Sequence, residues 1–104
     1  MNANVGLLLE DIQITSREWD ILQFIIKQQE QGKDVFYVDD PFMDAKVSDY
    51  IEELIVMEKA PRCLIVGMAN PHTVMGTNDV PRKGYPITIT PIGGAALRAP
   101  RPSQ

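Results

Sequence analysis

Long hydrophobic runs and cysteines are the two features that this sequence most clearly lacks. The N-terminal apolar patch at Val5–Leu9 is far shorter than the roughly 20 residues that a membrane-spanning helix needs. No basic residue precedes it, which argues against a signal peptide. A lone cysteine, Cys63, excludes an internal disulfide framework and is typical of a reducing compartment. We therefore expect a cytoplasmic protein with no membrane partner.

Histidine is scarce as well, and the neighbours of the only one, His72, are poor partners for chemistry. Asn70 and Thr73 do not complete a metal site or orient a general base. Gly93-Gly94 follows an expected strand but lacks the spacing of a phosphate-binding loop. Because no pattern combines a nucleophile, a base and an orienting group, we expect a protein that is not an enzyme and holds neither a metal nor a cofactor.

The net charge of −4 is unevenly distributed along the chain. Residues 1–60 hold 5 basic and 13 acidic groups, a net charge of −8, whereas residues 61–104 hold 5 basic groups and one acidic group, a net charge of +4. This asymmetry indicates either a face that meets an anionic partner or simply the position of the solvated helices. Both interpretations stay open at the level of the sequence.

The 104 residues suit one domain, which can bury roughly 65% of its unfolded surface. A first helix is expected over residues 16–31, because Thr15 and Glu18 have the spacing of a capping box and Gly32 follows as a left-handed C-cap. Residues 35–38 are β-branched and aromatic, and they predict a short strand.

The chain from Pro41 to Lys59 is expected to hold the central helix. Its apolar residues recur at helical spacing: Val47, Tyr50, Ile51, Leu54 and Ile55. Asp40 would be the N-cap with Pro41 in the first turn, and Ala60-Pro61 would end the helix. The helix is either continuous or broken near Asp44. A continuous helix would expose Phe42, which favours a break or a partner covering that face.

A hairpin is expected to follow this helix. Residues 63–68 begin with an apolar run in which Cys63 is a small buried hydrophobe, and residues 85–90 alternate as a second strand that pairs with it. Residues 69–84 have prolines, glycines and no periodicity, which predicts a long loop at the tip. Pro91–Gly94 would end the second strand before a last turn at residues 95–97.

The domain is therefore expected to span residues 1–97. Residues 98–104 carry two prolines and no apolar anchor, which predicts a flexible C-terminal tail.

This order of elements resembles the winged helix-turn-helix superfamily. Residues 14–22 look like the opening of the first helix in many such domains, where a hydrophobe and a threonine precede a capped helix. Residues 89–97 are similar to the Thr-x-x-Gly segment that closes the wing in MarR-like regulators. The resemblance implies an α+β, mostly α, winged helix-like fold with a β-hairpin wing and a short third strand. It also implies a DNA-binding transcription regulator that acts as a homodimer, with Val5–Leu9 as a dimer arm.

The sequence departs from this superfamily in two ways. Only about 20 residues separate the strand at residues 35–38 from the wing, so the helix before the turn is short or missing. The outer face of the expected recognition helix carries carboxylates, which repel a polyanion. The candidate residues on and beside that face are Ala45, Lys46, Ser48, Asp49, Glu52 and Val56.

The expected DNA contacts therefore lie on the wing and its flanks, where cations can meet phosphates. The residues predicted for this role are Arg62, His72, Arg82, Lys83 and Arg98. The alternative is an acidic winged-helix module that binds no DNA and docks on a basic protein partner. Its acidic helix face, with Val56 and Met57 in reach, has the composition of such an interface.

Overall fold

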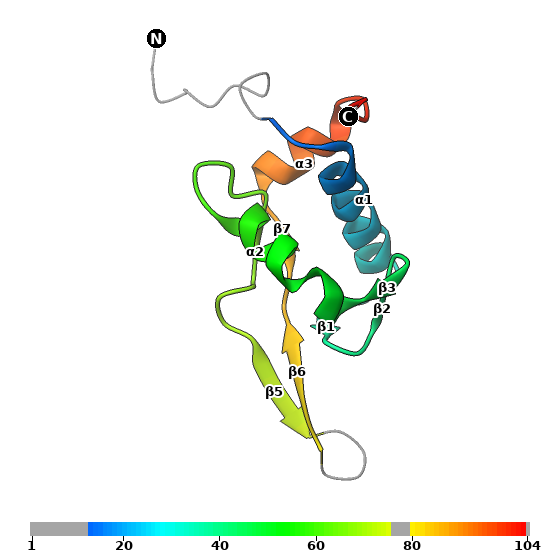
Figure 1. The fold of residues 1–104 in the computed structure, drawn as a ribbon, viewed down its shortest axis with the longest axis vertical. Helices are drawn as coiled ribbons and strands as arrows, with labels where there is room; N and C mark the ends of the chain where they lie inside the picture. Colours follow the sequence, from blue (N-terminus) through cyan, green and yellow to red (C-terminus); the bar gives the residue numbers. More distant parts are fainter. Residues whose placement is uncertain (1–12, 76–79, 104) are drawn as a thin grey trace.

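Three α-helices and a set of short antiparallel strands form an α+β fold in the computed structural model, which describes residues 13–75 and 80–103 (Figure 1). The elements in chain order are α1 (Ser16–Glu30), β1 (Phe36–Tyr37), β2 (Pro41–Phe42), β3 (Ala45–Lys46), the 3-10 helix η3 (Val47–Tyr50), α2 (Ile51–Glu58), β4 (Ile65–Val66), β5 (His72–Met75), β6 (Pro81–Tyr85), β7 (Thr88–Ile89) and α3 (Pro91–Arg98). The helices gather in one body, and the β5–β6 hairpin projects from it (Figure 1). None of the helices in the described residues is long and apolar enough to span a membrane.

The predicted capping box of α1 is confirmed. The Thr15 hydroxyl accepts a hydrogen bond from the Glu18 N–H at 3.0 Å, and the Glu18 carboxylate accepts one from the Thr15 N–H at 3.1 Å. Gly32 follows the helix with a φ of +94°, a conformation that costs glycine little. The helix buries Ile21, Leu22 and Ile25 in the core.

The prediction of a helix starting at Pro41 was wrong. Residues 41–46 form a small hairpin in which Pro41 pairs with Lys46 and Phe42 with Ala45. Asp40 does not cap a helix, because its carboxylate accepts the N–H of Tyr37 at 2.9 Å. The break near Asp44 is present, but what precedes it is a hairpin and not a short helix.

Phe42 explains why the hairpin replaces the helix. Its side chain is fully buried, with ring centroids of Phe24, Phe36 and Tyr50 at 4.8, 6.0 and 4.9 Å. A continuous helix would turn Phe42 away from the core, so the chain reverses at Met43 and inserts the ring. Burying a phenylalanine stabilises a fold by about 1.5–3 kcal/mol.

The helical stretch after the hairpin begins as a 3-10 turn. The Asp49 carboxylate accepts the N–H of Lys46 at 3.1 Å at the start of η3. The Tyr50 hydroxyl donates to the Asp44 carboxylate at 2.5 Å, and this bond raises the pKa of Tyr50. The α2 helix then buries Leu54 and Met57 and ends before Pro61.

The predicted pairing of residues 63–68 with residues 85–90 is confirmed for two residues of each strand, whereas Tyr85 belongs to β6 and pairs with Phe36. Ile65 lies opposite Ile89 and Val66 opposite Thr88. Cys63 is only half-buried and has a φ of +45°, so it is not the buried residue that the apolar run predicted.

The prediction of a long loop over residues 69–84 was wrong. Here β5 pairs with β6, from His72 opposite Gly84 to Met75 opposite Pro81. The other edge of β6 pairs with β1, which gives the strand order β1-β6-β5. All four residues of β5 are exposed, and no buried face imposes an alternating pattern on the sequence.

The sequence predicted only a last turn at residues 95–97, after a strand end at residues 91–94. Residues 91–98 form α3, with Pro91 in its first turn and Thr90 as its N-cap. The Thr90 hydroxyl accepts the N–H of Gly93 at 3.1 Å and lies 2.6 Å from the Cys63 carbonyl, to which it donates. The helix is therefore fixed at its start to the chain that leads into β4.

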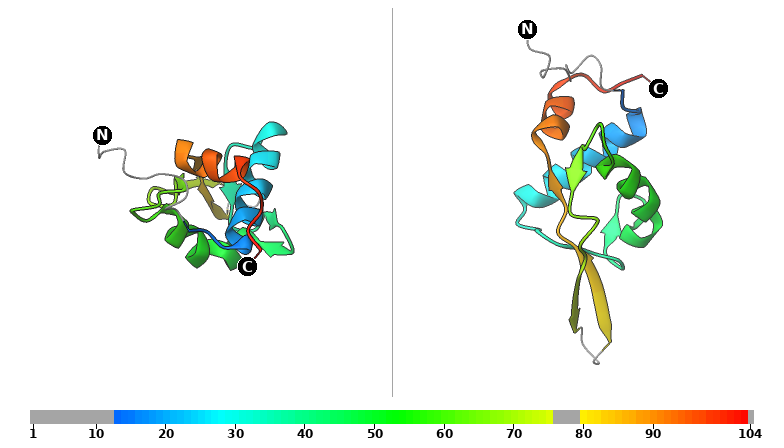
Figure 2. Two further views of the ribbon diagram at one scale, coloured as in Figure 1. Left: turned by 90° about the horizontal axis from the view of Figure 1, so that it is seen from above. Right: turned by 90° about the vertical axis from the view of Figure 1, so that its left-hand side faces the viewer.

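Contacts also join the C-terminal residues to α1, although the sequence predicted no anchor there. The Arg101 guanidinium donates twice to the Asp20 carboxylate, at 2.8 and 2.9 Å. The Trp19 indole N–H donates to the Ala99 carbonyl at 3.3 Å. The C-terminal chain therefore lies beside the first part of α1 (Figures 1 and 2). The predicted dimer arm at Val5–Leu9 lies outside the described residues.

Candidate functional site

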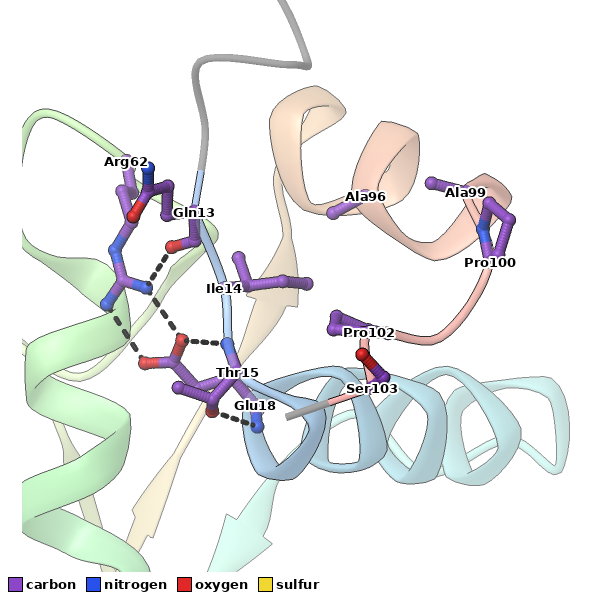
Figure 3. A pocket seen from close by; sticks show the side chains of 10 residues that line it. All are labelled: Gln13, Ile14, Thr15, Glu18, Arg62, Ala96, Ala99, Pro100, Pro102 and Ser103. Atoms are coloured by element: carbon purple, nitrogen blue, oxygen red, sulfur yellow. Dashed lines mark hydrogen bonds and ion pairs between the residues drawn. The ribbon is translucent and has the colours of Figure 1, made fainter.

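Arg62 is placed away from the wing on which the sequence predicted it. It lies on the loop between α2 and β4, where its guanidinium meets the Glu18 carboxylate at 2.7 and 3.0 Å (Figure 3). One of its nitrogens also donates to the Gln13 carbonyl at 3.1 Å. The start of α1 is at the end of the body opposite the β5–β6 hairpin (Figure 1). Arg62 therefore fixes α1 to the loop and is not part of a cationic wing.

A cleft of about 730 Å³ opens beside this ion pair (Figure 3). Arg62 and Glu18 line one wall, and Ala96, Ala99 and Pro100 line the other. Burial on its own would raise the pKa of Glu18, but the hydrogen bonds from Arg62 and from the Thr15 N–H outweigh it and lower the pKa below the usual value. Both charged groups of the cleft are thus engaged with each other.

Arg82 lies on the β5–β6 hairpin, but carboxylates of the same chain pair with it. Its guanidinium donates to Asp39 at 2.7 Å and to Asp40 at 3.3 Å. It also stacks over the Tyr37 ring, 4.3 Å from the centroid. The hydrogen bond from Arg82 lowers the pKa of Asp39, because it favours the ionised form of the carboxylate.

The three other residues predicted to contact DNA are not gathered in one place. Lys83 is exposed on β6, opposite Thr73, and His72 is exposed at the start of β5. Because His72 lies opposite Gly84, it shares its sheet face with Arg82 and not with Lys83. Arg98 is exposed in the last turn of α3, in the body opposite the hairpin (Figure 1). The described residues therefore show no continuous basic strip.

The opposite charges of the two halves of the sequence largely pair with each other in the fold. Three arginines from the positive half pair with carboxylates from the negative half: Arg62 with Glu18, Arg82 with Asp39 and Asp40, and Arg101 with Asp20. Each pair joins segments far apart in the chain. The positive half is thus mostly neutralised by the negative half, which leaves few cations for an outside partner.

The residues predicted for a recognition-helix face are exposed but do not share one helix. Lys46 is on β3, Ser48 and Asp49 are on η3, and Glu52 is on α2. These residues do not share one helix because α2 begins only at Ile51.

Two apolar residues accompany the acidic groups on α2. Val56 is 49% exposed, as the sequence predicted for the outer face. Ile55, which the helical stripe placed in the core, is 40% exposed. We call Asp49, Glu52, Ile55 and Val56 the α2 face. Glu53 is excluded, because it pairs with Arg17.

Sequence reasoning missed a second exposed apolar group, on the hairpin. Val74, Met75 and Val80 are all exposed at or near its far end. A prediction of the hairpin would have identified them, because apolar residues in a strand without a buried face have to point to solvent. Among the described residues, no group of three or more histidine, cysteine or acidic side chains could hold a metal ion.

No protein-family model, curated protein or solved structure matches this chain. What the protein does therefore has to be inferred from its own residues.

Proposed function

We propose that this chain is a winged-helix-type interaction module whose α2 face docks on a basic surface of a protein partner. The order of elements supports a winged-helix type: α1, the strand β1, the helix α2 and then a projecting hairpin whose β6 strand pairs with β1. The β2–β3 hairpin and η3 stand where such domains have the helix before the turn. This arrangement supports the proposal, because the spacing of the sequence predicts a short or missing helix before the turn.

The exposed carboxylates of the α2 face carry the proposal. Glu52 and Val56 are one helical turn apart on the same side of α2, and Asp49 precedes them by one turn. Apolar groups beside a charged rim are typical of interfaces between proteins. Carboxylates on such a face favour a basic partner, because complementary charge steers association and penalises the wrong partners.

Affinity capture of partners with Glu52→Lys tests the proposal. A protein that the wild-type chain recovers should carry a basic surface, and the reversed charge should repel it. We expect its recovery to fall by about tenfold or more, since like charges brought together cost at least about 1.4 kcal/mol.

The matched control is Glu30→Lys. Glu30 is also exposed, but it ends α1 and is not part of the α2 face. This variant has the same net charge as Glu52→Lys and should recover the partner as the wild type does. Equal recovery with all three chains would show that the α2 face is not the interface.

DNA binding by the wing is a second candidate function, and one observation favours it. The β5–β6 hairpin projects from the body with Lys83 and His72 exposed on it (Figure 2). A projecting basic hairpin can contact phosphates along a groove. Dimerisation would then present two such hairpins to one duplex.

A mobility shift of a labelled duplex separates the two functions. If the wing binds DNA, the duplex is retarded at about 50 mM salt, where phosphate contacts are strong. Lys83→Ala should then weaken binding and reduce the salt dependence by about one phosphate contact. Arg98→Ala removes a cation from α3 and should have no effect. No retardation at low salt would exclude this function and leave the α2 face.

A further inference from the structure

One edge of the projecting hairpin is uncovered. The strand order places β5 at the end of its sheet, and within residues 13–75 and 80–103 its backbone pairs only with β6. Every second residue of an antiparallel strand directs its N–H and C=O groups away from its neighbour. Such an open row of donors and acceptors is a template on which another strand can pair.

The two edges of the hairpin are not alike. The outer edge of β6 is covered by β1 near Tyr85, and its free part holds Pro81, which has no N–H, and Arg82, which is charged. These are the residues with which proteins block a sheet edge. The β5 strand, His72–Met75, has neither a proline nor a lysine, arginine or acidic residue. Only the β5 edge is therefore suited to pairing.

We propose that β5 pairs antiparallel with β5 of a second copy of this chain. A two-fold axis perpendicular to the sheet keeps each residue on its own face, and directly opposed residues must share a face. The axis therefore lies midway between one residue and that residue's own symmetry mate. An axis at Val74 places Val74 opposite its symmetry mate and Thr73 opposite Met75. An axis at Thr73 places Thr73 opposite its mate and His72 opposite Val74. Neither arrangement brings fully charged side chains together. Each opposes a β-branched residue to its own mate, Val74 in one and Thr73 in the other, and such pairs are favourable.

The exposure of the strand supports self-pairing. Val74 is 38% exposed and Met75 is 63% exposed, and a second β5 would cover part of both. The hairpin points away from the helices, so its edge is accessible to another copy (Figures 1 and 2). Four residues a side bury much less than the roughly 1,200 Å² of a standard interface, so the dimer should dissociate on dilution. This pairing is independent of the α2 face.

Sedimentation of the full chain over a concentration series tests the proposal. We expect a reversible equilibrium between monomer and dimer. If Val74 faces its own mate, Val74→Asp should raise the dissociation constant by about tenfold, because it opposes like charges and removes an apolar pair. If Thr73 faces its own mate, Thr73→Asp should have this effect, because it opposes like charges in that register. The matched control is Val66→Asp on β4, which is also exposed and should leave the equilibrium unchanged. A monomer at every concentration would overturn the proposal and leave the edge to an extended segment of another protein. A dimer that neither Val74→Asp nor Thr73→Asp weakens would also overturn it.

Cysteine cross-linking identifies the register independently. Residues opposed in antiparallel strands have Cα atoms roughly 4.5–5.5 Å apart, which is within reach of a disulfide. In a Cys63→Ala background, Thr73→Cys or Val74→Cys should form a disulfide-linked dimer on mild oxidation, whichever residue lies on the axis. Val66→Cys is the control and should stay monomeric. Cross-linking of Val66→Cys alone would place the interface elsewhere and overturn the proposal.

Discussion

Replacing Gly93 with alanine is expected to destabilise the protein by at least about 2 kcal/mol, although alanine favours helices. A Cβ at this position would lie 2.2 Å from the Leu64 carbonyl oxygen and 3.0 Å from the Ile89 side chain. Rotation of a side chain cannot relieve a clash with a backbone oxygen. The α3 helix would have to move away from Leu64, and the Thr90 hydroxyl would be pulled from the Cys63 and Leu64 carbonyls. Urea denaturation measures the loss.

The neighbouring glycine supplies the control. A Cβ at Gly94 meets nothing within 4 Å, and the residue is inside the same helix. Gly94→Ala should therefore stabilise the protein by about 0.5–1 kcal/mol, because the unfolded chain loses freedom. The same chemical change one residue apart should thus have opposite signs. If both substitutions stabilise, α3 does not lie against Leu64 and β7 as the structure shows.

The parts of the fold that the sequence predicted are those where local signals agree with the tertiary structure. At α1 the capping box, the apolar stripe and Gly32 all mark one helix, and no long-range contact overrides them. The pairing of β4 with β7 was predictable because both segments are apolar or β-branched. The sequence predicted that the segment between them would return the chain as a hairpin. The mixed α+β character follows from these two elements.

Other elements depend on contacts that a local pattern does not contain. The residues after Asp40 have the signals of a helix start, but the burial of Phe42 against Phe24 and Phe36 decides for a hairpin. The β5–β6 hairpin carries no alternating pattern, because solvent surrounds its far end. The sequence predicts a strand end where α3 begins, because a proline and two glycines are common in turns as well as at the start of this helix.

The candidate sites depend on pairing, which a count of charges cannot predict. Arg62 is 44 residues from Glu18 along the chain, and Arg82 is 43 residues from Asp39. The sequence therefore predicted four cations and His72 for contacts with a partner, and the fold pairs two of the cations with its own carboxylates. The exposed acidic residues of the α2 face could be predicted, since nothing basic lies one turn from Glu52 on the same side.

Replacing Phe42 with alanine should have the largest effect on stability, a loss of about 3–5 kcal/mol. The ring is fully buried and lies edge-on or tilted against three other rings, so the loss of aromatic contacts adds to the cavity. These rings come from α1, β1 and η3, which the Phe42 side chain therefore joins. Thermal or urea denaturation measures the change. Met43→Ala is the control, because Met43 follows Phe42 and is exposed in the turn. This substitution should change stability by less than about 0.5 kcal/mol.

The same substitution should also loosen the start of the α2 face. Two backbone hydrogen bonds seat η3 on the preceding chain, from Val47 N–H to the Asp40 carbonyl at 3.1 Å and from Ser48 N–H to the Val38 carbonyl at 2.9 Å. With the Phe42 ring removed, deuterium exchange at these two amides should accelerate more, relative to the wild type, than exchange at the amides of α1. The reason is that local opening near a cavity needs less free energy than global unfolding. Uniform acceleration of all amides would show that Phe42 supports the whole core equally. Unchanged exchange together with a loss below about 1 kcal/mol would contradict a core role for the hairpin.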